Sequence, residues 1–539
     1  MNPNEIKEKL LEILISNGYQ YEKFNVFPSA KKEFGDFSTN LFFKLKKTEK
    51  QISTGDLINL IKNDPWIKEN FEKIEEKNGF INFFVKNQVV YATVEEILRA
   101  DRSYGKNNLG NKKKVLIEFV SANPTGPLTI AHGRQAAFGE ALARILRACG
   151  YSVTKEYYLN DCGRQMELLG VSLKARYLQL KGIPAEIPED GYHGEYLKDI
   201  AEKIQDIALD TDNKFFENFA KEEILKMIKK DLADFNVYFD SWFPESELRN
   251  NGDVEKIIEK LKEKGLVYQK DDALWFKSTV FGDDKDRVLR KKDGSYTYLA
   301  PDIAYHQDKI KRGFDILINL WGPDHAGYVS RIKAAVKAMG FDPEKLHIII
   351  VQLTTLYRGK EKILMSTRKG QFITLRQLMD EVGPDSTKFF FLFRRADSHL
   401  DFDMELAKKQ TEENPVFYIQ YAFVRAMHIL SFGETKGFKQ NDFIHADFSL
   451  LKQDIEIEMI KRLKNFPLIV EQAAKTLEVS KIAGYILDIS GTFHSYYQKF
   501  RVVDENEDLS LARLALVKCF SIVMQNGLDM LGISQPEKM

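Results

Sequence analysis

Apolar and polar positions along the 539-residue chain change their period several times, and each change predicts a different kind of element. Residues 115–120 form a compact apolar run that is typical of a buried strand. Residues 138–149 then place apolar side chains on one helical face, and Gly150 is a suitable stop. Further strands are predicted at residues 153–159, 316–320 and 347–351. Strands that alternate with crossover helices predict an α/β fold with a doubly wound parallel sheet, whose ligands lie at the carboxyl ends of the strands.

Two regions outside this central pattern predict separate domains. Residues 1–105 combine amphipathic helices with an aromatic, β-branched strand, which predicts an N-terminal α+β domain. Residues 105–114 are polar and rich in glycine and lysine, as in a linker. The central domain is predicted at residues 112–395, with a charged helical insertion at about 164–270. Residues 405–539 are helical throughout, which predicts a C-terminal α-helical bundle.

Composition narrows the class of protein. Lysine and arginine (79) balance aspartate and glutamate (79), so no overall basic charge marks a nucleic-acid binder, although a local patch would suffice. The three cysteines lack Cys-x-x-Cys spacing, which excludes a zinc ribbon and a disulfide framework and favours a cytoplasmic location. No signal peptide is visible, and no apolar run approaches about 18 residues, so we expect no membrane partner. No cluster of divalent-ion ligands is evident, so we expect no tightly held metal.

The loop after the first strand of the central domain carries the densest group of motif residues. Residues 118–127 read Glu-Phe-Val-Ser-Ala-Asn-Pro-Thr-Gly-Pro, and residues 129–132 read Thr-Ile-Ala-His at the start of a helix. The N-terminus of a helix offers backbone N–H groups and a positive dipole end to a phosphate. With residues 157–165 and 296–306, this run resembles the arginyl-tRNA synthetase family of class I aminoacyl-tRNA synthetases. The resemblance implies a class I Rossmann-type catalytic domain.

The resemblance also implies an ATP site built from two elements. Residues 129–132 stand where class I enzymes carry His-Ile-Gly-His, so only the second histidine is present. Residues 363–370 stand in place of the Lys-Met-Ser-Lys-Ser loop, but Leu364 and Thr367 replace its lysines, and Arg368 and Lys369 are the nearest cations. ATP would bring Mg²⁺ with it. The residues expected to act in catalysis are His132, Arg368, Lys369 and Thr129. The residues expected to bind ATP are Ala122, Asn123, Pro124, Thr125, Gly126, Pro127, Leu128, Ile130, Ala131, Gly133, Gly322, Asp324, His325, Met365 and Ser366.

Two of these assignments have plain structural alternatives. Gly322, Asp324 and His325 follow a predicted strand, where a ribose or adenine would lie, but a tight turn with a helix N-cap at Asp324 explains them as well. Glu118 lies at the end of the first strand, where it either binds substrate or pairs with a structural cation. A guanidinium substrate requires planar carboxylates for its fork of N–H donors. The resemblance implies that arginine is bound by Glu118, Ser121, Asn123, Tyr298 and Asp302.

Taken together, the resemblance implies an arginine–tRNA ligase. It would activate L-arginine with ATP to arginyl-adenylate, release pyrophosphate, and transfer arginine to the 3′ end of tRNA(Arg). Residues 1–105 would contact the tRNA, residues 405–539 would bind its anticodon, and a monomer is expected. A catalytically silent RNA-binding paralogue is an alternative, because residues 129, 131, 364 and 367 depart from the class I motifs. A class I enzyme for another amino acid is a third hypothesis, which the paired acids disfavour.

Overall fold

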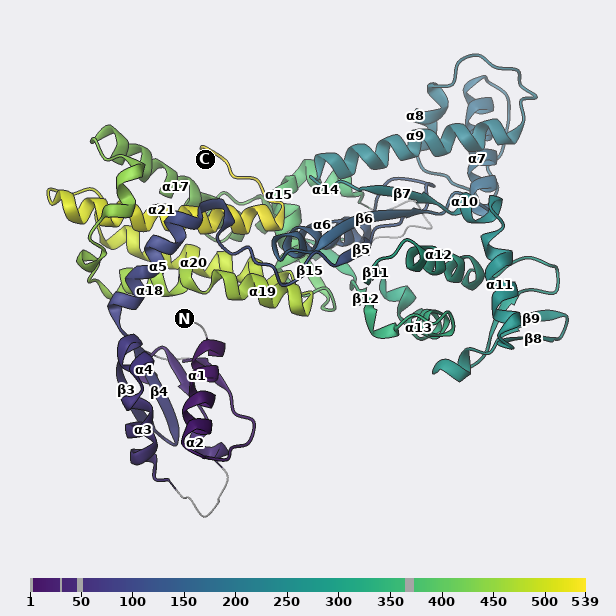
Figure 1. The fold of residues 1–539 in the computed structure, drawn as a ribbon. Coiled ribbons are helices and arrows are strands. Elements are labelled where there is room, and N and C mark those ends of the chain that lie inside the picture. Colours follow the sequence, from purple (N-terminus) through teal and green to yellow (C-terminus); the bar gives the residue numbers. More distant parts are fainter. Residues whose placement is uncertain (1–2, 30–31, 46–51, 364–372) are drawn as a thin grey trace. The chain divides into compact units, whose positions relative to one another are not determined.

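The computed structural model describes residues 3–29, 32–45, 52–363 and 373–539 (Figure 1). The chain divides by its internal contacts into two compact units. The first unit comprises Met1–Tyr104, Arg425–Leu468 and Gly491–Met524, and the second comprises Gly105–Val424, Ile469–Ser490 and Gln525–Met539. Each unit therefore combines segments that lie far apart in the sequence.

The N-terminal part of the first unit is an antiparallel sheet with helices packed against it, as predicted for an α+β region. Its strands follow the order β1-β2-β4-β3. Apolar side chains of β4, among them Ile81 and Phe83, are wholly buried, which fixes the face of this sheet that meets its helices. The elements are α1 (Pro3–Ser16), β1 (Val26–Pro28), β2 (Phe37–Thr39), α2 (Leu41–Lys44), α3 (Thr54–Asn63), α4 (Pro65–Asn70), β3 (Phe71–Lys77), β4 (Phe80–Val85) and α5 (Asn87–Ala100).

The second unit contains the predicted parallel sheet, which has the order β12-β11-β5-β6-β7. All of its neighbouring strands run parallel, and β5 lies at the centre between β6 and β11. Because the chain moves from β5 to β6 on one side and later adds β11 on the other, the topological switch point lies at β5. The strands are β5 (Lys114–Glu118), β6 (Ser152–Leu159), β7 (Ser241–Pro244), β11 (Ile316–Trp321) and β12 (Leu346–Ile350).

Helices cover both faces of this sheet (Figure 1). On one face α6 (Ile130–Ala148) packs against β5 and β6. On the other face Leu116 and Leu317 join a core with α11 (Asp253–Glu263), α12 (Leu299–Lys311) and α13 (Val329–Ala338). Residues that alternate along β5 therefore contribute to two cores, as expected for a strand buried on both faces.

The stretch at about 164–270 is not helical throughout. It contains the helices α7 (Arg164–Leu180), α8 (Tyr196–Glu202), α9 (Asn213–Asp234) and α10 (Glu245–Asn250), but β7 lies within it and pairs with β6 in the main sheet. The sequence gives little sign of β7, because the strand has only four residues, Ser-Trp-Phe-Pro, and ends in proline. A run this short shows no recognisable period.

Two smaller sheets and the C-terminal helices complete the described chain. The sheets have the orders β10-β9-β8 and β14-β13-β15. Their strands are β8 (Val267–Lys270), β9 (Ala273–Phe276), β10 (Arg287–Arg290), β13 (Thr354–Arg358), β14 (Glu361–Lys362) and β15 (Leu400–Asp403). The helices are α14 (Leu375–Val382), α15 (Pro384–Phe393), α16 (Met404–Lys408), α17 (Pro415–Thr435), α18 (Asp454–Lys464), α19 (Phe466–Thr476), α20 (Ser480–Lys499) and α21 (Glu507–Leu531).

Helix α21 is, within the described residues, the one helix long and apolar enough by length and composition to cross a membrane. Its most apolar window is 83% buried inside the protein. The apolar length of α21 is therefore explained by packing in a protein core.

Candidate active site

The loop between β5 and α6 begins with a strained turn. Val120 and Ser121 are consecutive non-glycine residues with positive φ, 66° and 41°. Such a backbone costs on the order of 1–3 kcal/mol per residue, so surrounding contacts must hold it. The Tyr158 main-chain N–H donates to the Ser121 hydroxyl at 3.1 Å, and the Ser121 N–H donates to the Phe119 carbonyl at 2.9 Å. Strand β6 therefore fixes the point at which the loop leaves the sheet.

Side chains from the neighbouring segment hold the rest of the loop. The Tyr157 hydroxyl donates to the Ala122 carbonyl at 2.8 Å, and the Asn123 amide donates to the Gln165 side chain at 2.6 Å. The Tyr196 hydroxyl donates to the Thr125 carbonyl at 2.5 Å. Residues outside the loop therefore fix its conformation through these three hydrogen bonds. Its side chains are half-buried at Asn123, Thr125, Gly126 and Pro127 and buried at Ala122, Pro124, Leu128 and Ile130, so the latter four could meet ATP only through their main chain.

The first turn of α6 orients a neutral histidine. The Thr129 N–H donates to Nδ1 of His132 at 3.2 Å. Burial lowers the pKa of His132 to about 4, and the charge of Asp324 offsets this only in part. Because Nδ1 accepts a hydrogen bond in the neutral ring, the proton is on Nε2. His132 can therefore donate one hydrogen bond to a phosphate oxygen at pH 7, but it carries no charge there.

Gly133 sets how closely α6 approaches α14. A Cβ atom at Gly133 would lie 2.6 Å from Cδ1 of Leu375, which is closer than packed carbons allow. The Leu375 N–H also donates to the Leu128 carbonyl at 2.8 Å, and Thr129 forms an isolated bridge with Thr374. These two contacts attach the loop to the start of α14. Ala131, one residue after the buried Ile130, is exposed to solvent.

The end of β11 brings a second group of predicted residues to the same edge of the sheet. Gly322 is the N-cap of the short 3-10 helix η4 (Pro323–Tyr328). Asp324 and His325 are exposed in this helix, and Nε2 of His325 lies 3.4 Å from Oδ2 of Asp324. The cap position is Gly322, which makes no side-chain cap, so the N-cap alternative for Asp324 does not describe this turn. Since the charge of Asp324 acts on His132, and a Cβ atom at Gly322 would lie 3.9 Å from the side-chain amide nitrogen of Gln135, the turn after β11 lies near the first turns of α6.

Glu118 lies at the carboxyl end of β5 and is already paired with a cation. Its Oε2 accepts a hydrogen bond from Nζ of Lys309 at 2.6 Å, and the Lys309 side chain is wholly buried. Lys309 also donates to Asn319 at 3.0 Å, and Asn319 contacts Nε2 of His306 at 2.9 Å. This is the contact that the structural alternative for Glu118 predicted. A substrate guanidinium would have to share the carboxylate with Lys309, so the role of Glu118 in the arginine site stays a prediction.

Asp302 on α12 forms no ion pair with a cation among the described residues. Burial, together with the charges of Glu118 and Glu245, raises its pKa to about 7, and a hydrogen bond from Tyr328 and the charge of Lys309 offset this rise only in part. Tyr298, one helical turn before it, is 75% exposed and lies outside the buried cluster. The site thus offers one unmatched acid to a cationic ligand.

The raised pKa of Asp302 predicts that the affinity for arginine depends on pH. The ionised fraction rises from about one tenth at pH 6 to about nine tenths at pH 8. Since a guanidinium binds the carboxylate and not the neutral acid, KM for arginine is expected to fall about tenfold over this range. Arginine-dependent pyrophosphate exchange between pH 6 and pH 8 measures this change. An Asp302→Asn variant, which has no titrating group at this position, should show a flat profile, and a sloping profile in that variant would assign the titration elsewhere.

Sequence reasoning missed three buried members of this network. They are His306, Lys309 and Asn319. His306 and Lys309 lie on the same face of α12 as the predicted Asp302, four and seven residues after it. The His306 Nδ1 lies 2.8 Å from the Asp302 carbonyl, and burial lowers the pKa of His306 to about 3. The polar face of α12 was the available signal, because a helix that buries a lysine and a histidine needs partners for them. Asn319 carried no such signal, since it interrupts an apolar strand only once.

The second predicted ATP element lies outside the described residues. Strands β13 and β14 lead into it, and the described chain resumes just before α14. No structural statement is made for Leu364, Met365, Ser366, Thr367, Arg368 and Lys369, whose roles stay predictions. In the described part of the chain, no group of three or more His, Cys, Asp or Glu side chains could hold a metal ion.

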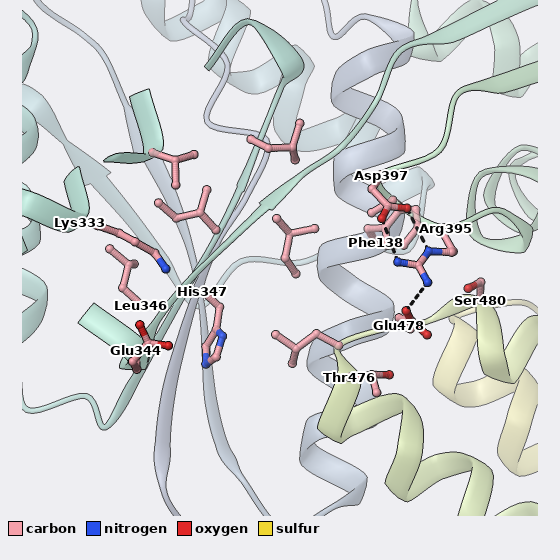
Figure 2. A pocket seen from close by; sticks show the side chains of 16 residues that line it. Phe138, Lys333, Glu344, Leu346, His347, Arg395, Asp397, Thr476, Glu478 and Ser480 are labelled. Atoms are coloured by element: carbon pink, nitrogen blue, oxygen red, sulfur yellow. Dashed lines mark hydrogen bonds and ion pairs between the residues drawn. The ribbon is translucent and has the colours of Figure 1, made fainter. Parts of the chain in front are cut away.

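A groove of about 390 Å³ runs beside the free edge of β12 (Figure 2). None of the predicted site residues lines it. Figure 2 shows Arg395 between Asp397 and Glu478, where its guanidinium pairs with both carboxylates at 2.9 and 2.7 Å. Phe138 of α6 lines the same groove. The groove therefore lies beside β12, whereas the predicted residues of the β5–α6 loop and of η4 follow the carboxyl ends of β5 and β11.

Models of known protein families match three parts of the chain. The catalytic domain of class I tRNA synthetases (R) matches residues 93–390, more than half of the chain. The DALR anticodon binding domain matches residues 419–539. The arginyl tRNA synthetase N-terminal domain matches residues 2–85.

Relatives match over almost their whole length. The chain is 43% identical to an arginine–tRNA ligase of Anoxybacillus flavithermus and 42% identical to one of Bacillus subtilis, in each case over 99% of this chain and 98% of the relative. The solved arginyl-tRNA synthetase of Thermus thermophilus is 21% identical, covers 100% of both chains with a TM-score of 0.76, and thereby shows the same fold. The chain belongs to the arginyl-tRNA synthetase family of class I aminoacyl-tRNA synthetases.

Proposed function

We propose that this protein is an arginine–tRNA ligase that joins L-arginine to tRNA(Arg) at the expense of ATP. The observation that carries the choice of amino acid is Asp302, a half-buried acid without a cation partner among the described residues. A guanidinium supplies the planar donors that such a carboxylate requires. An amino acid without this group would leave the Asp302 carboxylate without a cation, which costs on the order of several kcal/mol. The site therefore selects arginine without a separate editing reaction.

The first step is an in-line attack by the arginine carboxylate on the α-phosphorus of ATP, with pyrophosphate as the leaving group. No covalent enzyme group is required, so the protein contributes position and charge stabilisation. The Nε2–H of His132 and the free N–H groups at the start of α6 are placed to donate to phosphate oxygens. Mg²⁺ is expected to arrive on the phosphates of ATP. The cations Arg368 and Lys369 are proposed to balance charge on the leaving pyrophosphate.

The second step transfers arginine to the 3′ end of the tRNA. We propose that residues 1–105 contact the tRNA, that residues 112–395 carry out both reactions, and that residues 405–539 bind the anticodon. Family models for an N-terminal synthetase domain and an anticodon binding domain support the outer two assignments. A monomer in the cytoplasm is expected. Arginine activation in this family can wait for bound tRNA, so the assays below include it.

One assay separates this proposal from its alternatives. Arginine-dependent exchange of pyrophosphate into ATP is measured with and without tRNA, and charging with labelled arginine is measured beside it. The proposal predicts exchange and charging with arginine only. Binding of tRNA without charging would favour the silent paralogue, which the substitutions at residues 129, 131, 364 and 367 suggested. Charging with lysine or glutamine would show that Asp302 does not select the substrate.

A further inference from the structure

Arg134 is a wholly buried cation in the second turn of α6, two residues after His132. Among the described residues no carboxylate forms an ion pair with it. Its guanidinium donates instead to four main-chain carbonyls: NH1 to Gln352 at 2.8 Å and Leu353 at 3.3 Å, and NH2 to Arg395 and Ser398 at 2.9 Å each. Burial lowers the pKa of Arg134 to about 10, so the group is still charged at pH 7.

The four carbonyls belong to two segments that meet beside α6. Gln352 and Leu353 connect the end of β12 to β13, and Arg395 and Ser398 connect α15 to β15. The segments are joined to each other, because the Gln352 N–H donates to the Ala396 carbonyl at 2.8 Å and β13 pairs with β15. Arg134 thus ties both segments to the helix that carries His132.

Two of the carbonyls that Arg134 binds lie just beyond the carboxyl end of β12. Nucleotides bind at the carboxyl ends of parallel strands, and Gln352 is the second residue beyond β12. The first turn of α6, which carries His132, follows the carboxyl end of β5 in the same sheet. The Arg395 side chain is held separately by Asp397 and Glu478 (Figure 2). Arg134 therefore links the start of α6 to the segments that follow β12 and α15.

We propose that Arg134 is a positioning residue for ATP: it sets the spacing between the first turn of α6 and the carboxyl end of β12. The proposal rests on the proposed function, since ATP is the ligand. The role requires an arginine at position 134, because a planar guanidinium can direct its N–H donors to two pairs of carbonyls. A lysine ammonium cannot reach all four carbonyls. It assigns Arg134 no contact with the reacting atoms.

The test compares Arg134→Lys and Arg134→Met with the matched variant Lys155→Met in the full-length protein. Lys155 is also a buried cation bonded to α6, through Glu140 at 2.6 Å, but it lies in β6 on the side away from β12. Arg134→Lys is expected to raise KM for ATP about tenfold, because a small shift of α6 relative to β12 would misplace the bound ATP. KM for arginine should stay within about twofold of the wild-type value. Lys155→Met should lower the unfolding temperature without changing either KM.

A direct measurement of ATP binding by calorimetry accompanies the kinetics. It separates failure of this proposal from failure of the proposed function, because a wild-type protein that binds ATP without charging tRNA still reports the effect of Arg134→Lys. Weaker ATP binding in both Arg134 variants, with unchanged binding in Lys155→Met, supports the positioning role. Unchanged ATP binding in Arg134→Lys, equal losses for ATP and arginine, or a wild-type protein that does not bind ATP would overturn it.

Discussion

Replacement of Asp302 by asparagine is expected to raise KM for arginine about 100-fold while KM for ATP stays within about threefold. Removal of one partner from a buried, hydrogen-bonded charge pair costs about 2–5 kcal/mol, and about 2.7 kcal/mol corresponds to 100-fold. Asparagine keeps the shape of the side chain but brings two N–H donors toward a ligand that itself carries only donors. Pyrophosphate exchange at varied arginine and varied ATP, in the presence of tRNA, measures the two constants.

Asp324→Asn is the matched control for this prediction. Its carboxylate is exposed at the end of β11, and its charge acts on His132. The control should affect KM for ATP more than KM for arginine, which is the reverse of the pattern expected for Asp302→Asn. If Asp302→Asn raised both constants equally, Asp302 would be a structural acid of α12 and the arginine site would lie elsewhere.

Replacement of Lys309 by methionine is expected to lower the free energy of unfolding by about 3 kcal/mol or more. The substitution removes a wholly buried ammonium from Glu118, whose carboxylate then lies buried in β5 without its cation. Breaking a buried pair from one side typically costs about 3–5 kcal/mol, whereas replacing both partners by neutral groups costs much less. Urea denaturation followed by circular dichroism measures the loss.

The double variant Lys309→Met/Glu118→Gln tests the physical cause. It should regain most of the stability that Lys309→Met loses, because no unpaired charge stays in the core. Lys292→Met serves as the control, since Lys292 and Asp272 form an ion pair at 3.0 Å with side chains 78% and 67% exposed. That variant should change stability by about 1 kcal/mol or less. A double variant no more stable than Lys309→Met would refute the ion-pair explanation.

The sequence was sufficient to predict the parallel sheet, because β5, β11 and β12 are largely apolar, β6 is rich in β-branched and aromatic residues, and α6 shows its helical face. The loop at residues 118–133 was predicted as a phosphate-binding turn because it lies between a predicted strand and the start of a predicted helix. The partners of Glu118 were not predictable in this way, since Lys309 lies 191 residues away and their contact exists only after β11 and α12 have packed. No local pattern of apolar and polar residues indicates an ion pair between segments so far apart in the sequence.

Arg134 shows a different limit on prediction from sequence. Its four acceptors are main-chain carbonyls, which every residue possesses, so no particular side chain marks them in the sequence. The raised pKa of Asp302 was likewise hidden, because it depends on burial and on acids from other elements. Family resemblance could place Asp302 in the arginine site, but only the packing of the domain shows that it stands without a cation.

The central place of β5 has a consequence during protein synthesis. β5 ends at Glu118, but β11, which pairs with it on one side, begins at Ile316. At about 5–20 residues per second, the ribosome needs roughly 10 to 40 s to supply the missing strand. During that interval one apolar edge of the nascent sheet has no partner and resembles the exposed edges that lead to aggregation. Chaperone dependence of this chain should therefore be greatest while residues 119–316 are being translated.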